Sequence, residues 1–238
     1  MKKLLSVFLM VSMVFVGTEM FAQGKSKIKI SNGSAKDLVQ QIKDNPNAEE
    51  LYLFRNGLDS IPEEVGMLKN LKELTVSSNR VTYVPPVICT LTNLEKISLK
   101  NNNIKQLPAE IGNLKNLTEL DLDGNELEEL PESICNLENL TYLSVTNNKL
   151  YHLPQNIGNL QNLQFLYIGR NSLQELPASI ANLTELVELN IAGSGRMLVV
   201  PNMENCHNLE TLFIDSSTLF DESFSPRSLP RLEVRVLP

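Results

Sequence analysis

A chain of 238 residues, of which 42% are hydrophobic, can bury a sizeable core, which excludes a disordered or collagen-like polypeptide. Its formal net charge of −7 makes it a poor partner for phosphate backbones and anionic lipid headgroups, because both repel an acidic protein. We therefore expect no nucleic-acid binding and no adhesion to membrane surfaces.

The first residues have the organisation of a secretory signal peptide. Lys2 and Lys3 precede an apolar run over residues 4–17, and Ala22 is a small residue before the expected cut. Met20 occupies the third position before this cut, where signal peptides usually have a small residue, so the exact cleavage site stays open. The apolar run is shorter than the roughly 20 residues of a membrane-spanning helix. We predict that residues 1–22 are removed, and that the mature protein is secreted or periplasmic without membrane insertion.

Residues 23–47 are expected to cap the N-terminal end of the fold. The alternating segment KIKI suits a protective edge strand. A helix is predicted over residues 34–44, where Ser34 is a good N-cap and Leu38 with Ile42 form an apolar stripe.

One pattern of 23 residues then recurs about eight times over residues 48–220. Leucines at positions 71, 94, 117, 140, 163, 186 and 209 each begin L-x-x-L-x-L-x-x-N-x-L-x-x-L-P-x-x-I-x-x-L-x-N, with few exceptions. Self-similarity at a fixed period is the signature of a solenoid, in which each repeat buries its apolar face only against its neighbours.

This pattern resembles the leucine-rich repeat. The form with L-P followed by I-G-N-L is similar to the repeats of the Scribble and Erbin proteins, of plant intracellular Ras-group proteins and of secreted bacterial repeat proteins. The resemblance implies an α/β horseshoe solenoid with a parallel sheet on the concave face and short helical or irregular convex segments. It also implies that the usual function of such a protein is to recognise a binding partner.

The residues of a single repeat support this architecture. Leu94, Ile97 and Leu99 are expected to face inward from a short strand, whereas Lys96 and Ser98 point outward, as the period of two requires. Neighbouring copies would stack such strands in parallel.

Each strand is followed by an asparagine, at a turn that leaves backbone groups unpaired. A buried carboxamide can donate and accept at once, so one asparagine per repeat can bond to the turn. The ladder consists of Asn56, Asn79, Asn102, Asn125, Asn148 and Asn171. A proline later in each repeat suits the start of a short helical turn.

The pattern degrades near the C-terminal end. Ser194 replaces the ladder asparagine, Arg196 takes a leucine position, and an extra residue delays Pro201. Residues 221–238 are expected to form a C-terminal cap, in which LEVRVLP makes a closing strand whose register the sequence leaves open. We expect a monomer, with a dimer through this strand edge as the alternative.

The outward strand positions are not specified by the repeat and are free to recognise a partner. Tyr142, Phe165 and Tyr167 should cluster on adjacent strands with Arg170 close by, since cross-strand neighbours on one face lie within about 5 Å. Aromatic residues and arginine are enriched at binding hot spots. We expect a contact site here; the alternative is that the rings only shield the sheet.

Tyr52 and Phe54 form a second, weaker aromatic cluster near the N-terminal cap. They are candidate partner-binding residues, with packing beneath the cap as an equal alternative.

Charged residues occupy the centre of the same face. Glu119, Asp121 and Asp123 lie beside Lys96 and Lys100 of the preceding repeat. Paired acids can act in general acid and base catalysis, but on an open sheet with lysines nearby we expect nothing that encloses a substrate or raises a pKa. The sequence predicts a solvated charge ladder that helps to select a basic partner.

Motifs for catalysis, cofactors and metals are absent from the sequence. His152 and His207 lie on different repeats without a second ligand at metal-binding spacing. Cys89, Cys135 and Cys206 are expected to be free core residues. We therefore expect no enzyme, no catalytic residue, no metal and no cofactor. The lack of cysteine-rich caps favours a bacterial protein over an animal ectodomain.

The sequence thus predicts a non-enzymatic secreted module that binds a protein or peptide through its concave face. A glycan or peptidoglycan binder, whose rings would stack on sugars, and a surface spacer without a specific ligand are the alternatives.

Overall fold

The structure of the chain is a computed structural model that describes residues 27–31 and 35–237. The signal-peptide prediction and the N-cap prediction for Ser34 fall outside these residues.

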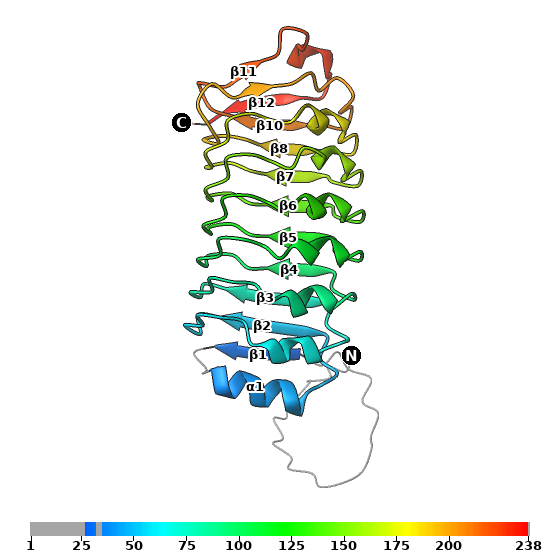
Figure 1. Cartoon of the computed structure of the whole chain (residues 1–238). Coiled ribbons are helices and arrows are strands. Elements are labelled where there is room, and N and C mark those ends of the chain that lie inside the picture. The colour runs from blue at the N-terminus through cyan, green and yellow to red at the C-terminus, as the bar shows by residue number, and fades with distance from the viewer. Residues whose placement is uncertain (1–26, 32–34, 238) are drawn as a thin grey trace, which may run out of the picture.

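A strand and a helix form the N-terminal end, at the positions that the sequence indicates. Strand β1 (Lys27–Ser31) pairs in parallel with β2 (Glu50–Phe54). Helix α1 (Ala35–Asp44) follows β1 and buries Leu38 and Ile42, which explains its apolar stripe. Figure 1 shows α1 at this end of the stack, next to β1.

Each repeat contributes one strand to a ten-stranded parallel sheet, in the order β1-β2-β3-β4-β5-β6-β7-β8-β10-β12. Strand order follows chain order, and Figure 1 shows the strands stacked from one end of the molecule to the other. This arrangement confirms the predicted α/β solenoid. The further strands are β3 (Glu73–Ser77), β4 (Lys96–Ser98), β5 (Glu119–Asp121), β6 (Tyr142–Ser144), β7 (Phe165–Tyr167), β8 (Glu188–Asn190), β10 (Thr211–Ile214) and β12 (Glu233–Val236).

Short 3-10 helices form a second column beside the sheet (Figure 1). A proline with φ between −61° and −66° stands at the N-cap of η1 to η4 and of η6, as predicted. The proline ring fixes φ near the value that a helix requires. Helix η5 begins instead after Asn156. The helices are η1 (Glu63–Met67), η2 (Pro86–Thr90), η3 (Ala109–Asn113), η4 (Glu132–Asn136), η5 (Ile157–Asn159), η6 (Ala178–Asn182) and η7 (Pro226–Ser228).

The core lies between the sheet and this helical column. Leu94, Ile97 and Leu99 are buried from the strand side, and Ile111 with Leu114 from the return side. Burying one such side chain stabilises the fold by roughly 1.5–3 kcal/mol. This stabilisation requires a neighbouring repeat to cover the side chain.

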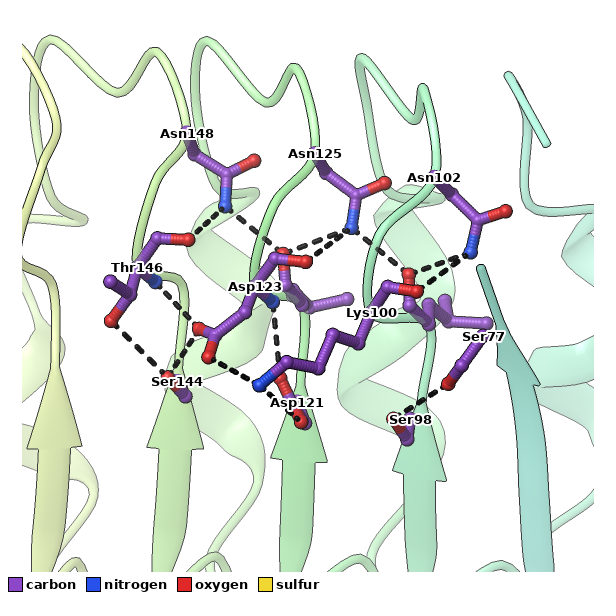
Figure 2. Close-up of polar contacts among 12 residues, drawn as sticks. Ser77, Ser98, Lys100, Asn102, Asp121, Asp123, Asn125, Ser144, Thr146 and Asn148 are labelled. Atoms are coloured by element: carbon purple, nitrogen blue, oxygen red, sulfur yellow. Dashed lines mark hydrogen bonds and ion pairs between the residues drawn. The ribbon is translucent and has the colours of Figure 1, made fainter. Parts of the chain in front are cut away.

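The asparagines after the strands bond to backbone groups of two repeats. The Asn125 amide nitrogen donates to the carbonyls of Leu99 and Leu122, each at 3.0 Å, and its oxygen accepts the Ile104 N–H at 3.1 Å. Asn102 and Asn148, which lie on either side of Asn125 in Figure 2, donate in the same way to carbonyls of two repeats.

A second series of asparagines, whose role the sequence pattern does not reveal, ties successive repeats together just before each strand. The Asn116 amide nitrogen donates to the Thr92 carbonyl at 2.9 Å, and that of Asn139 to the Lys115 carbonyl at 2.8 Å. The series consists of Asn93, Asn116, Asn139, Asn162 and Asn208. These bonds explain why asparagine recurs in the N-L part of the repeat.

The C-terminal repeats keep the stack although their sequence departs from the pattern. The Ser194 hydroxyl donates to the Ile168 carbonyl at 2.6 Å, as a ladder asparagine would do. An additional two-stranded sheet joins β9 (Val199–Val200) to β11 (Leu219–Phe220). The predicted closing strand is β12, which pairs in parallel with β10 and ends the sheet within the described residues. Dimer formation through this edge stays a prediction.

Across the described ranges, none of the helices has the length and apolar character needed to cross a bilayer.

Candidate functional site

The outward-facing side chains of the ten strands and of the turns that follow them form one continuous surface, which we call the sheet face. Because the strands pair in register, equivalent residues of successive repeats lie side by side. Glu119 thus lies between Lys96 and Tyr142, and Asp121 lies between Ser98 and Ser144. The sheet face is therefore a set of rows that run along the solenoid.

Three rings form an aromatic cluster on β6 and β7, as the sequence predicts. The centroid of the Tyr142 ring lies 6.5 Å from that of Phe165 and 5.5 Å from that of Tyr167. The rings are tilted by 43° and 55°, an arrangement that favours edge-to-face attraction. All three side chains are half-buried, so part of each ring is available to a partner.

Burial changes the titration of both tyrosines of this cluster, and a carboxylate bonds one of them. Burial and a hydrogen bond to Glu188 raise the pKa of Tyr167, and burial also raises the pKa of Tyr142. Both phenols therefore stay protonated at neutral pH and act as hydrogen-bond donors. The cluster combines apolar ring surface with polar groups at its margin.

Arg170 lies in the turn after β7, at the position before a ladder asparagine. Its φ of 55° is left-handed, its side chain is exposed, and its Cγ faces Gly193 of the next repeat. Among the described residues, cation–ring contacts are made by Lys27, Arg55 and Arg235. The fold thus brings the three rings together and places Arg170 in the exposed turn that follows one of their strands.

The second aromatic pair divides between two environments. The Tyr52 hydroxyl donates to Glu73, and Lys27 Nζ lies 4.1 Å from the centroid of the Tyr52 ring and 2.6 Å from Glu50. Burial, followed by the bond to Glu73, raises the pKa of Tyr52. Tyr52 is therefore held by the chain itself, whereas Phe54 is 44% exposed, with the Arg55 guanidinium carbon 4.9 Å from its ring centroid.

The predicted charge ladder is present beside the aromatic cluster. Lys96 Nζ lies 2.6 Å from Glu119, and Lys100 Nζ lies 3.0 Å from Asp123 and 3.8 Å from Asp121. Figure 2 shows Lys100 reaching across to both aspartates of the next repeat.

Asp123 is the most highly bonded carboxylate of this ladder. Its Oδ1 accepts the backbone N–H of Thr146 at 2.8 Å and the hydroxyl of Ser144, while Oδ2 faces Lys100 (Figure 2). Asp123 therefore ties three successive repeats together, a role that a residue-by-residue reading of the sequence does not reveal.

The expectation that nothing raises a pKa here is wrong for Asp121. Burial raises the pKa of this carboxyl and the Asp123 charge adds to the rise, although the Asp123 N–H and Lys100 oppose it. The surface is also hollowed, because short side chains at Thr75 and Ser98 lie between longer ones. A depression of about 280 Å³ is lined by Glu73, Thr75, Lys96, Ile97, Ser98, Glu119, Asp121 and Tyr142.

The cysteines lie away from the sheet face, as expected. Cys89, Cys135 and Cys206 are free and buried. Burial raises the pKa of Cys89 and Cys135 to about 12 and that of Cys206 to about 11. These groups are therefore protonated core thiols.

Comparison with known families assigns most of the chain to one family. Residues 96–151 and 134–235 match the family described as "Leucine-rich repeat region", and residues 69–110 match "Leucine Rich repeats (2 copies)". No curated protein gives a significant match.

Three solved structures illustrate what the fold is similar to. A leucine-rich-repeat protein of Leptospira interrogans has 27% identity and a TM-score of 0.56, with 86% of this chain and 64% of that chain covered. An internalin (inlF) of Listeria monocytogenes, at 20% identity, shows the fold alone, with a TM-score of 0.59 and coverage of 83% and 69%. The plant peptide hormone receptor RGFR1, solved in complex with RGF2, has 29% identity and a TM-score of 0.69, with coverage of 91% and 34%.

The chain therefore spans 64% of the Leptospira protein and 34% of the receptor.

Proposed function

The chain belongs to the leucine-rich repeat family, and we propose that it is a secreted, non-enzymatic module that binds a protein or peptide through its concave sheet face. The aromatic cluster of Tyr142, Phe165 and Tyr167 carries this proposal, because rings gathered on an exposed surface usually mark contact sites. The neighbouring carboxylates would orient the partner.

The scaffold suits recognition energetically. Its sheet face is built from hydrogen-bonded strands tied by asparagines, so binding would require little ordering of the surface. The similar plant receptor was solved with its peptide hormone, which supports a peptide or protein ligand for this chain as well.

Secretion is proposed from the leader-like pattern of residues 1–22. Mass spectrometry of the exported protein should find a new N-terminus close to Gln23. Material that retains Met1 in the exported fraction would contradict cleavage.

The test of the binding surface is affinity capture from host and envelope extracts. Wild-type protein is compared with a triple variant, Tyr142→Ala, Phe165→Ala and Tyr167→Ala, whose thermal unfolding is checked first. The matched control replaces Tyr83 and Tyr151 with alanine, because these rings are 54% and 49% exposed and lie outside the strands.

We expect a partner that wild type and control capture and that the triple variant loses. Equal capture by all three proteins would contradict the aromatic-anchor proposal. Retention of a polysaccharide instead of a protein would favour the glycan-binding alternative.

A further inference from the structure

The N-terminal end of the sheet face joins a ring, a carboxylate and a cation of the chain itself. Lys27 Nζ lies 4.1 Å from the centroid of the Tyr52 ring and 2.6 Å from Glu50. A cation is stabilised there by the negative face of the ring and by the carboxylate together.

The C-terminal end repeats this arrangement with other residues. The guanidinium carbon of Arg235 lies 5.7 Å from the centroid of the Phe213 ring, and its terminal nitrogen lies 2.8 Å from Glu233. Both ends of one surface therefore pair aromatic rings and carboxylates with cations.

The centre of the sheet face also places carboxylates beside an aromatic ring, but there no cation among the described residues contacts the ring. Tyr142 lies opposite Glu119 on the neighbouring strand, with Asp121 two residues further along. Within the described part of the chain, cation–ring contacts involve Tyr52, Phe54 and Phe213, and none involves Tyr142. The lysines of the centre instead face carboxylates.

Those lysines leave one carboxylate only partly satisfied. Lys96 pairs with Glu119 at 2.6 Å, and Lys100 pairs with Asp123 at 3.0 Å. Asp121 accepts the Asp123 N–H through Oδ1, but its Oδ2 lies 3.8 Å from Lys100 Nζ, beyond hydrogen-bond distance.

The depression around Asp121 favours a positive occupant. Its lining contains three acidic side chains, Glu73, Glu119 and Asp121, and one basic side chain, Lys96. This surplus of negative charge beside the Tyr142 ring complements a cation, and the volume of about 280 Å³ accommodates a side-chain head group.

We propose that an arginine of an extended partner segment inserts into this depression, stacks on the Tyr142 ring and pairs with the Asp121 carboxylate. Arginine fits better than lysine because its planar guanidinium both stacks on a ring and bonds a carboxylate through two N–H groups. The aromatic cluster next to the depression then contacts the residues that flank the arginine. This inference rests on the proposed function and specifies the chemistry of the partner.

The experiment is an NMR titration of the mature protein, residues 23–238, with acetyl-Leu-Arg-Leu-amide and with its citrulline counterpart. Citrulline has nearly the shape of arginine but no charge. We expect the arginine peptide to bind about tenfold more tightly and to shift the resonances of residues 142–144.

Two protein variants test the role of Asp121. In Asp121→Asn the preference for arginine should fall to within about twofold, because the substitution removes the charge and keeps an acceptor. In the control Glu210→Gln, which removes one charge at an exposed residue outside the strands, the preference should be unchanged.

Equal affinity for the two peptides, failure of both to bind, or an unchanged preference in Asp121→Asn would each overturn the inference. These outcomes are separable from the proposed function. If the triple ring variant still loses its captured partner, the sheet face binds a partner of other chemistry, and only the arginine assignment fails.

Discussion

Lys100 and Asp123 form an ion pair between successive repeats, at 3.0 Å, while the same lysine nitrogen lies 3.8 Å from Asp121. Two aspartates separated by one residue therefore differ in role. Both side chains are half-buried, but Asp123 is bonded by groups of both neighbouring repeats, whereas Asp121 is less well paired. This difference leads to opposite predictions for their substitution.

Asp123→Ala should lower the free energy of unfolding by about 2 kcal/mol, because the Thr146 N–H and the Ser144 hydroxyl lose a charged acceptor. Chemical denaturation would measure this loss. Asp59→Ala is the control, since Asp59 forms an exposed ion pair with Arg80 and should cost less than about 1 kcal/mol. Similar losses for the two variants would contradict the structural role of Asp123.

Asp121→Asn should stabilise the protein at pH 7. The folded state raises the pKa of Asp121 above its ordinary value of 3.8, so the folded protein binds the proton more tightly than the unfolded chain. Ionised Asp121 therefore costs stability, and this cost disappears as the pH falls from above the raised pKa to below 3.8.

Melting temperatures of wild type and Asp121→Asn at pH 7 and at pH 4 would check this prediction. The advantage of the variant should shrink at pH 4. A variant that is less stable than wild type at pH 7 would show that Lys100 outweighs burial and the Asp123 charge. Residues of binding sites often lower the stability of the unbound protein in this way.

Asn125→Ala should destabilise the solenoid by about 2–4 kcal/mol. The substitution leaves the Leu99 and Leu122 carbonyls and the Ile104 N–H without this buried partner. Asn113→Ala is the matched control, because Asn113 is exposed at the end of η3, and its loss should stay within about 0.5 kcal/mol. Equal denaturation midpoints would contradict the role assigned to the ladder.

The thiols of Cys89, Cys135 and Cys206 should react slowly with iodoacetamide in the native protein at pH 8. Their pKa values are raised to about 12, 12 and 11, so almost no reactive thiolate is present. Mass spectrometry should find all three alkylated after unfolding in guanidinium chloride. Rapid labelling of any of them in the native state would contradict burial.

Much of the candidate site could be predicted because the repeat determines register. Equal spacing of the inward leucines aligns each strand with the next, so Tyr142 must lie opposite Phe165 and Lys96 opposite Glu119. The prediction for Asp121 failed for a different reason. Its pKa depends on how deeply the carboxyl is buried and on where Asp123 and Lys100 lie around it.

Some residues were missed because their role depends on contacts with the backbone of another repeat. Asn116 and Asn139 recur in the sequence, but only the fold shows that their amides reach carbonyls of the preceding repeat. Arg170 is predicted close to the rings by its position after β7, and this placement stays a prediction; its side chain is exposed in a left-handed turn.

The sequence by itself determined the period of the solenoid, the inward and outward positions of each strand and the rows of residues on the sheet face. A periodic apolar pattern suffices for this, because only one register buries the leucines of every repeat. The tertiary structure decided which carboxylates the lysines neutralise and where the surface is hollowed. Those features depend on side-chain torsions and on competing charges a few ångströms apart, which no repeat pattern specifies.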